Sequence, residues 1–147
     1  MAVKTRIILA VLPALIVAGC SSTESKNEYV DTVNDIQNTV IEASNSLSSA
    51  PVTSEKDAIA AFEKAEGQVK AAVDQLEEVE VPEEAQEGHE ELVAGFAELE
   101  QLIADVREQV EKGGGQDAFQ ELKNKGAEID KRIDEAITQI NSDLGVE

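Results

Sequence analysis

The sequence predicts an all-α protein, an antiparallel up-down-up-down four-helix bundle that follows a short N-terminal signal. In four long stretches, apolar residues recur at alternating intervals of four and three, which is typical of helices that pack along one another. Proline or glycine residues interrupt this pattern between the stretches. The 147 residues suit one domain, and a hydrophobic content of 41% argues against a disordered chain.

Residues 1–19 are expected to be a signal peptide that is absent from the folded domain. Lys4 and Arg6 precede an apolar run, Ile7 to Val17, in which Pro13 is the only interruption. A positive start, an apolar run and small residues after it are the layout of a secretory signal. A membrane span needs about 20 apolar residues, so this run is short for one. The alternative is a core helix at the extreme N-terminus.

The four residues Val17-Ala18-Gly19-Cys20 end this run, and Cys20 is the only cysteine of the chain. They resemble the lipobox of bacterial lipoproteins, in which an aliphatic residue and two small residues precede a cysteine. The resemblance implies cleavage before Cys20, a diacylglyceryl thioether on its sulfur and an acyl chain on its new amino group. The alternative is an ordinary secretory signal in which the cysteine is accidental.

The resemblance also implies a location. Two or more acyl chains anchor a protein stably in a membrane, so residues 20–25 become the lipidated cysteine and a short polar tether. The protein would lie on the extracytoplasmic face of the cell membrane. In a host with two membranes, Ser21 after the cysteine implies the outer membrane. No cofactor is expected beyond the covalent lipid.

The bundle is expected over residues 26–144, and its first helix over 26–49. Ser25 and Glu28 have the spacing of a capping box at the helix start. Pro51 ends the helix because proline disfavours helical backbone at the residue before it. The residues expected to face the core are Tyr29, Val33, Ile36, Val40, Ala43 and Leu47.

The second helix is expected over residues 54–79, starting after Thr53 or Ser54. Glu55 and Asp57 then lie in the first turn, where the helix dipole favours carboxylates. The expected core positions are Ala58, Phe62, Ala65, Val69, Ala72, Leu76 and Val79.

The third helix is expected over residues 82–112, with Pro82 at the first helical position, where its missing N–H has no cost. Gly113 can take the left-handed conformation that ends a helix, and Gly113 to Gly115 form the next turn. The expected core positions are Ala85, His89, Leu92, Phe96, Leu99, Ile103, Val106 and Val110.

The fourth helix is expected over residues 116–144. A glycine costs a helix about 1 kcal/mol relative to alanine, so Gly126 on the apolar stripe suggests a close approach of a neighbouring backbone, opposite Phe62 or Phe96. The alternative is that Gly126 is simply tolerated. The expected core positions are Phe119, Leu122, Gly126, Ile129, Ile133, Ala136 and Ile140.

Short connections favour antiparallel neighbours. The main alternative architecture is an extended array, or a helical dimer in which two hairpins exchange partners.

His89, the only histidine, lies on the apolar stripe of the third helix, and Tyr29, the only tyrosine, is expected at the same end of the bundle. One interpretation is a ligand or cation site in the bundle that also uses Glu84 and Glu87. The other is a histidine at the edge of the core that is satisfied by a hydrogen bond to Tyr29.

Eight glutamates and no basic residue lie between Glu77 and Glu91. Carboxylates suit hard divalent cations, but their spacing is not that of an EF-hand. Most of these side chains are expected to form a solvated face. Divalent cations that bridge this cluster to an anionic membrane are the alternative.

The sequence contains no motif typical of a di-iron site, a phosphate-binding loop or a catalytic triad. Di-iron bundles need Glu-x-x-His motifs, whereas Gln86 stands three residues before His89. There is no phosphate-binding loop, and one histidine with no identifiable nucleophile does not indicate a catalytic triad. A formal charge of −19 excludes electrostatic nucleic-acid binding as the default function. No enzyme activity and no confident metal site are therefore predicted.

The function expected from the sequence is that of a non-enzymatic envelope lipoprotein. It would present an acidic helical bundle as an interaction or accessory module for an envelope protein or a basic ligand. The alternative function is a lipoprotein that binds a cation or small ligand through His89 and neighbouring glutamates.

Overall fold

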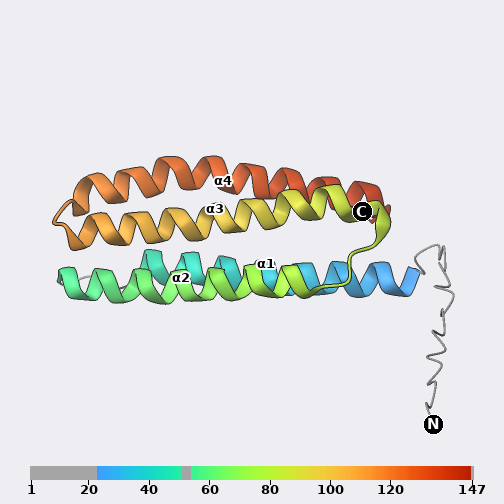
Figure 1. Cartoon of the computed structure of the whole chain (residues 1–147), viewed down its shortest axis with the longest axis horizontal. Coiled ribbons are helices and arrows are strands. Elements are labelled where there is room, and N and C mark those ends of the chain that lie inside the picture. The colour runs from blue at the N-terminus through green and yellow to red at the C-terminus, as the bar shows by residue number, and fades with distance from the viewer. Residues whose placement is uncertain (1–22, 51–53, 147) are drawn as a thin grey trace, which may run out of the picture.

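A computed structural model describes residues 23–50 and 54–146 of the chain (Figure 1). These residues are almost entirely helical and include no strand, which confirms the all-α prediction. None of the described helices combines the length and the apolar character that a membrane span requires. The elements in chain order are α1 (Thr23–Ser49), α2 (Glu55–Glu78), the short 3₁₀ helix η1 (Glu83–Ala85), α3 (Gln86–Glu111) and α4 (Gly115–Leu144).

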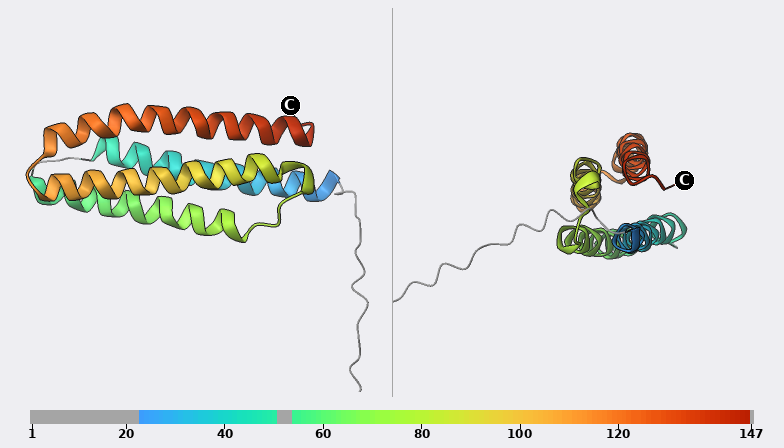
Figure 2. Two further views of the ribbon diagram at one scale, coloured as in Figure 1. Left: turned by 45° about the horizontal axis from the view of Figure 1, so that its top comes forward. Right: turned by 90° about the vertical axis from the view of Figure 1, so that its right-hand side faces the viewer.

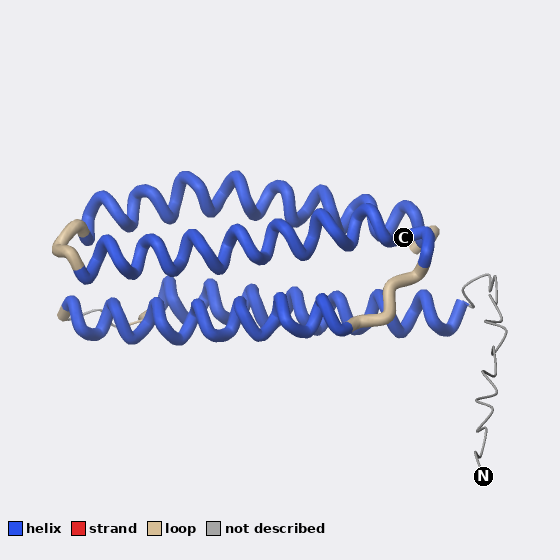
Figure 3. The backbone as a smooth tube through the Cα atoms, in the orientation of Figure 1, coloured by secondary structure: helices blue, strands red, loops and turns tan. Residues whose placement is uncertain are grey.

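Successive helices pack along one another, α1 on α2, α2 on α3 and α3 on α4. Figure 3 shows the short connection between α3 and α4 at one end of the molecule. The start of α1, the connection between α2 and α3 and the end of α4 lie at the other end (Figure 1). In the end-on view of Figure 2, α1 and α2 form one layer and α3 and α4 form a second layer above it.

The starts of α1 and α2 follow different local rules. The helix α1 already includes Thr23, so Ser25 lies in its first turn and does not stand before it as the capping-box prediction required. The helix α2 begins after Ser54, as predicted. The Ser54 side-chain oxygen accepts a hydrogen bond from the Asp57 backbone N–H at 3.2 Å and satisfies one of the free donors of the first turn.

The start of α3 differs from its prediction. Pro82 has an extended ψ of 142° and precedes the separate turn η1, so it is not the first residue of a continuous helix. The end of α3 is as predicted. Gly113 has a left-handed φ of +84°, and its N–H donates to the Val110 carbonyl while the Gly114 N–H donates to Gln109, both at 2.9 Å. This pair of bonds is a Schellman motif.

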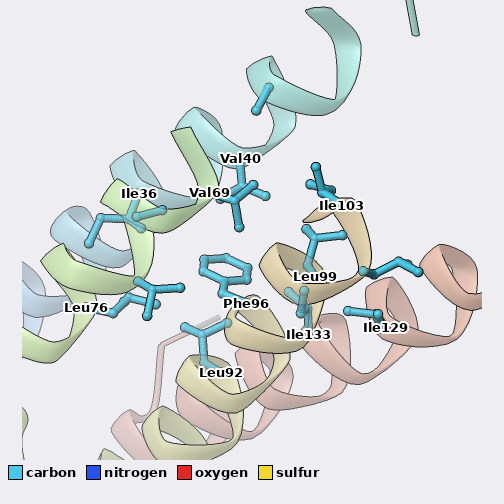
Figure 4. Packing of buried hydrophobic residues seen from close by; sticks show 14 of the residues in the cluster. Ile36, Val40, Val69, Leu76, Leu92, Phe96, Leu99, Ile103, Ile129 and Ile133 are labelled. Carbon is cyan, nitrogen blue, oxygen red and sulfur yellow. The ribbon is translucent and has the colours of Figure 1, made fainter. Parts of the chain in front are cut away.

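The core follows the predicted stripes closely. Every predicted core position of α3 and of η1 is buried, and so are all but the last predicted positions of α1 and α2, where Leu47 and Val79 are partly buried. Figure 4 shows the Phe96 ring among side chains of the other helices. Among the largest fully buried side chains are Tyr29, Phe62, Phe96, Leu76, Leu92 and Ile140.

Two predictions for α4 are wrong: the burial of Phe119, and the close approach of a neighbouring backbone at Gly126. Phe119 is 43% exposed and packs its ring against Phe62, at 5.5 Å between ring centroids, while its neighbour Ala118 takes the buried position. The inward face of α4 is therefore turned by one residue at its start. Leu122 and Gly126 are only partly buried.

The predicted close approach at Gly126 is also absent, because a Cβ atom built there would have no neighbour within 4 Å. The close approach occurs instead between α3 and α4. A Cβ atom on Gly88 would lie 2.8 Å from the Ile140 side chain and 3.3 Å from the Ala136 carbonyl oxygen. A Cβ atom on Gly95, one heptad later, would lie 2.8 Å from Ile133. The two glycines allow the backbones of α3 and α4 to approach each other.

Candidate functional site

The predicted lipidation site lies outside the described residues. Cys20 and the three residues before it precede Thr23, the first residue of α1. The described structure therefore begins three residues after the cysteine.

His89 of α3 is held by a residue of another helix. Its Nδ1 atom lies 3.0 Å from the Tyr29 hydroxyl of α1, and both side chains are buried. The two rings are tilted against each other, with 5.8 Å between their centroids. This hydrogen bond ties α1 to α3.

Burial shifts the pKa values of both Tyr29 and His89. Tyr29 is 2% exposed, and burial raises the pKa of its hydroxyl to about 12. His89 is 8% exposed, and burial lowers the pKa of its imidazole below 6.5, although the backbone of Leu76 and the Glu90 charge oppose that shift. The neutral histidine is therefore the form that this packed position favours. The geometry fits a buried side chain that joins α3 to α1 and whose Nδ1 atom is already engaged by Tyr29.

The two glutamates nominated with His89 are placed differently. The Glu84 carboxylate, in η1, forms an ion pair with Lys26 of α1 at 2.8 Å. Glu87 is exposed in the first turn of α3. Across residues 23–50 and 54–146, no three His, Cys, Asp or Glu side chains gather closely enough to hold a metal ion.

The side of the molecule between α1 and α4 carries a groove that the sequence analysis did not predict. These two helices are not among the pairs that pack extensively. Two adjoining hollows of about 260 and 250 Å³ lie between them and share Ser44 and Asp130 in their walls. We call this continuous feature the α1–α4 groove. The apolar side chains that line it are Val40, Ile41, Leu47, Ala65, Phe96, Leu99, Ile103, Leu122, Ala127 and Ile133.

The two edges of the α1–α4 groove differ in charge. The α1 edge is polar and uncharged, and its residues are Gln37, Ser44, Asn45 and Ser48. The α4 edge carries Asp130 and Asp134, with Lys123 nearer the start of the helix. Partial burial, and secondarily the Asp134 carboxylate, raise the pKa of Asp130 above its ordinary value.

The heptad pattern could not reveal this groove, because it marks which side of each helix is apolar but not how far apart two helices lie. The one signal was Gly126, which lies in the groove wall. Its missing side chain contributes to the open space, whereas the sequence suggested that a neighbouring backbone fills that space.

No protein-family model, curated protein or solved structure matches the chain.

Proposed function

We propose that the chain is a membrane-anchored, non-enzymatic lipoprotein of the cell envelope that acts as an interaction or accessory module. The observation that carries this proposal is the motif Val17-Ala18-Gly19-Cys20, in which the only cysteine of the chain stands where lipoproteins carry theirs. Cleavage before Cys20 removes Lys4 and Arg6 but no acidic residue. The mature chain then has 31 acidic and 10 basic residues and a formal charge of −21.

The proposed fold of this module is an up-down-up-down four-helix bundle. The positions of the helix ends in Figure 1 support that topology. A single buried cluster draws on all four helices of one chain, which favours a self-contained bundle over an extended array.

The proposed anchor gives the bundle an orientation. Because Cys20 precedes Thr23 by three residues, the lipid surface lies within about 10 Å of the start of α1. The connection between α2 and α3 and the end of α4 share that end of the molecule (Figure 1). The turn between α3 and α4 then points away from the membrane. The module lies on the extracytoplasmic face of the cell membrane, or of the outer membrane in a host with two membranes.

Lipid labelling tests the anchor. Bacteria that express the full chain are grown with radiolabelled palmitate, and the membrane fraction is collected. We expect label on the wild-type chain and none on Cys20→Ser, which should also leave the membrane fraction. The double variant Cys20→Ser/Ser22→Cys is the control, because a cysteine displaced from the motif should stay unlabelled. An unlabelled wild-type chain, or a Cys20→Ser chain that still sediments with membranes, contradicts the proposal.

A pull-down tests the interaction role. The anchored wild-type chain, solubilised from envelope extract, should retain at least one other envelope protein. Recovery of the chain alone contradicts a role as an interaction module and leaves the anchor untouched.

A further inference from the structure

We propose that the α1–α4 groove binds a basic amphipathic helix of another protein. This inference deepens the proposed function, because it names the surface and the chemistry of the partner that an interaction module requires. It is carried by three features of the groove: its length, its apolar lining and the charge of its edges.

The length and shape of the groove suit a helix. It is bordered by residues 37–48 of α1 and residues 123–134 of α4. At 1.5 Å per residue each border is about 16 Å long, or about three helical turns. Three turns present apolar side chains at positions i, i+3, i+4 and i+7 along one face. The space between α1 and α4 is therefore long enough for the anchoring residues of one partner helix.

The lining of the groove is apolar. Phe96, Leu99 and Ile103 of α3 form its floor and Val40 and Ile133 stand on opposite walls, and all five side chains are buried. Ile41 lines the groove on the α1 side and is 47% exposed, which makes it the most exposed large aliphatic side chain of the described residues. A helix seated in the groove would cover this side chain, which none of the described helices covers.

The charge of the groove edges favours a basic partner. Asp130 and Asp134 lie one helical turn apart, where like charges repel each other. Neither carboxylate forms an ion pair within the described part of the chain, which pairs acids and bases at eight other places. Lysine or arginine on the flank of a docked helix would neutralise both.

A second copy of this chain is a poorer occupant. It would bring a formal charge of −19 and the same pair of aspartates to the contact. Like-charge juxtaposition across an interface disfavours association. The groove therefore fits a basic helix from a different protein.

A binding measurement with a matched pair of glycine variants tests the site. The probe is a fluorescent leucine–lysine peptide of about 18 residues with leucines at helical spacing, long enough to form a helix. It is titrated against the full chain carrying Cys20→Ser, so that no lipid binds the probe. Gly126→Leu places a side chain in the groove without a clash, since no atom lies within 4 Å of its Cβ position. We expect it to weaken binding about tenfold or more.

Gly67→Leu is the control for Gly126→Leu. Gly67 also lies within a helix, in α2, has no neighbour within 4 Å of its Cβ position and does not line the groove. Its substitution should change the affinity by less than about twofold. Circular dichroism and urea unfolding establish that both variants are folded. Equal binding by the Gly126→Leu and Gly67→Leu variants overturns the site.

A second matched pair tests the charge. Asp130→Asn/Asp134→Asn removes two carboxylates from the groove edge, and Asp31→Asn/Asp35→Asn removes two exposed carboxylates with the same spacing from α1 outside it. We expect about fivefold weaker binding for the first pair and less than about twofold for the second. Equal effects of the two pairs indicate general attraction to an acidic protein and overturn the inference. Equal binding of a leucine–glutamate peptide overturns it as well.

Analytical sedimentation tests whether a second copy of the chain occupies the groove. The Cys20→Ser chain with no further substitution should be a monomer at the concentrations of the titration. A dimer that Gly126→Leu dissociates would show that a second copy covers the groove, which overturns the inference. Every measurement on the groove uses the Cys20→Ser chain. A negative result for the groove is therefore independent of the palmitate labelling that tests the proposed function.

Discussion

The hydrogen bond between Tyr29 and His89 joins two buried side chains. It joins α1 to α3. A buried hydrogen-bonding group that loses its partner costs more free energy than the bond itself contributes. This one pair should therefore matter more to stability than any of the exposed ion pairs.

Tyr29→Phe tests that expectation. The variant keeps the ring and its packing but leaves Nδ1 of His89 buried without a donor. We expect the free energy of unfolding to fall by about 1–3 kcal/mol, measured by urea denaturation. Lys70→Ala, which removes one partner of the exposed pair with Asp74, is the control and should cost less than about 1 kcal/mol. Similar losses for the two variants would contradict the special role of Tyr29.

The lowered pKa of His89 predicts a pH dependence of stability. Between the pKa in the folded state and 6.5, the unfolded chain binds more protons than the folded chain does. The free energy of unfolding should therefore fall as the pH drops below about 6.5 and stay level between about 7 and 8. Urea unfolding at a series of pH values measures it. His89 is the only histidine, so His89→Gln should flatten the slope from pH 7 to 5.5. An unchanged slope in that variant would assign the effect to other groups.

Helix packing shows where the sequence predicted the structure and where it could not. The heptad pattern identified the stripe of each helix, but α3 buries Gly88, Gly95 and Leu102 in addition to that stripe. The cause is its place in the molecule, since α3 packs on both α2 and α4. The helix α1 packs mainly on α2 and buries no position outside its predicted stripe. A repeat within one helix carries no information on how many neighbours that helix has.

The candidate site, too, could be predicted only in part from the sequence. Sequence reasoning could place Tyr29 and His89 at one end of the bundle, because heptad positions and antiparallel order determine their level. It could not show that Glu84 is paired with Lys26 while Glu87 stays exposed, since surface ion pairs depend on how α1 and η1 pack together. Sequence reasoning also predicted that two helix backbones approach each other closely at Gly126. The structure has that close approach at Gly88 and Gly95. All three glycines are compatible with helical spacing, and only the packing of α3 against α4 distinguishes them.

The glycines of α3 and α4 give opposite predictions for the same substitution. Gly88→Ala should destabilise the protein by about 1–3 kcal/mol, because its Cβ would overlap Ile140 and press against the α4 backbone. Gly126→Ala should stabilise it by up to about 1 kcal/mol, because alanine favours the helix and nothing obstructs its Cβ. Thermal and urea unfolding of both variants measure the difference. Stabilisation by Gly88→Ala would show that α3 and α4 are packed less closely than described.

The charge of the whole molecule is far from balanced. The chain has 31 acidic and 12 basic residues. Among the eight ion pairs of residues 23–50 and 54–146, three join different helical elements, and they are Lys26–Glu84, Arg107–Glu66 and Arg132–Glu98. A large net charge destabilises a compact state through self-repulsion. Repulsion among the helices should therefore outweigh the attraction of these pairs.

Salt should consequently stabilise the protein. Raising NaCl from about 10 mM to 1 M shortens the screening length from about 30 Å to 3 Å, which weakens long-range repulsion. We expect the melting temperature to rise, with a smaller rise for Asp31→Asn/Asp35→Asn because that variant carries two fewer negative charges. A melting temperature that falls with salt would show that the ion pairs dominate.

The attachment of α1 is uneven along its length. Near its start, Lys26 and Tyr29 connect it to η1 and α3. Beyond Gln37, α2 supports one side of it while the other side borders the α1–α4 groove. The first turns of α1 are therefore joined to two other elements, whereas its far half is joined mainly to α2. If Cys20 carries lipid, the joined end lies beside the bilayer, the groove lies farther from it, and a partner protein can reach the groove without contact with the anchor.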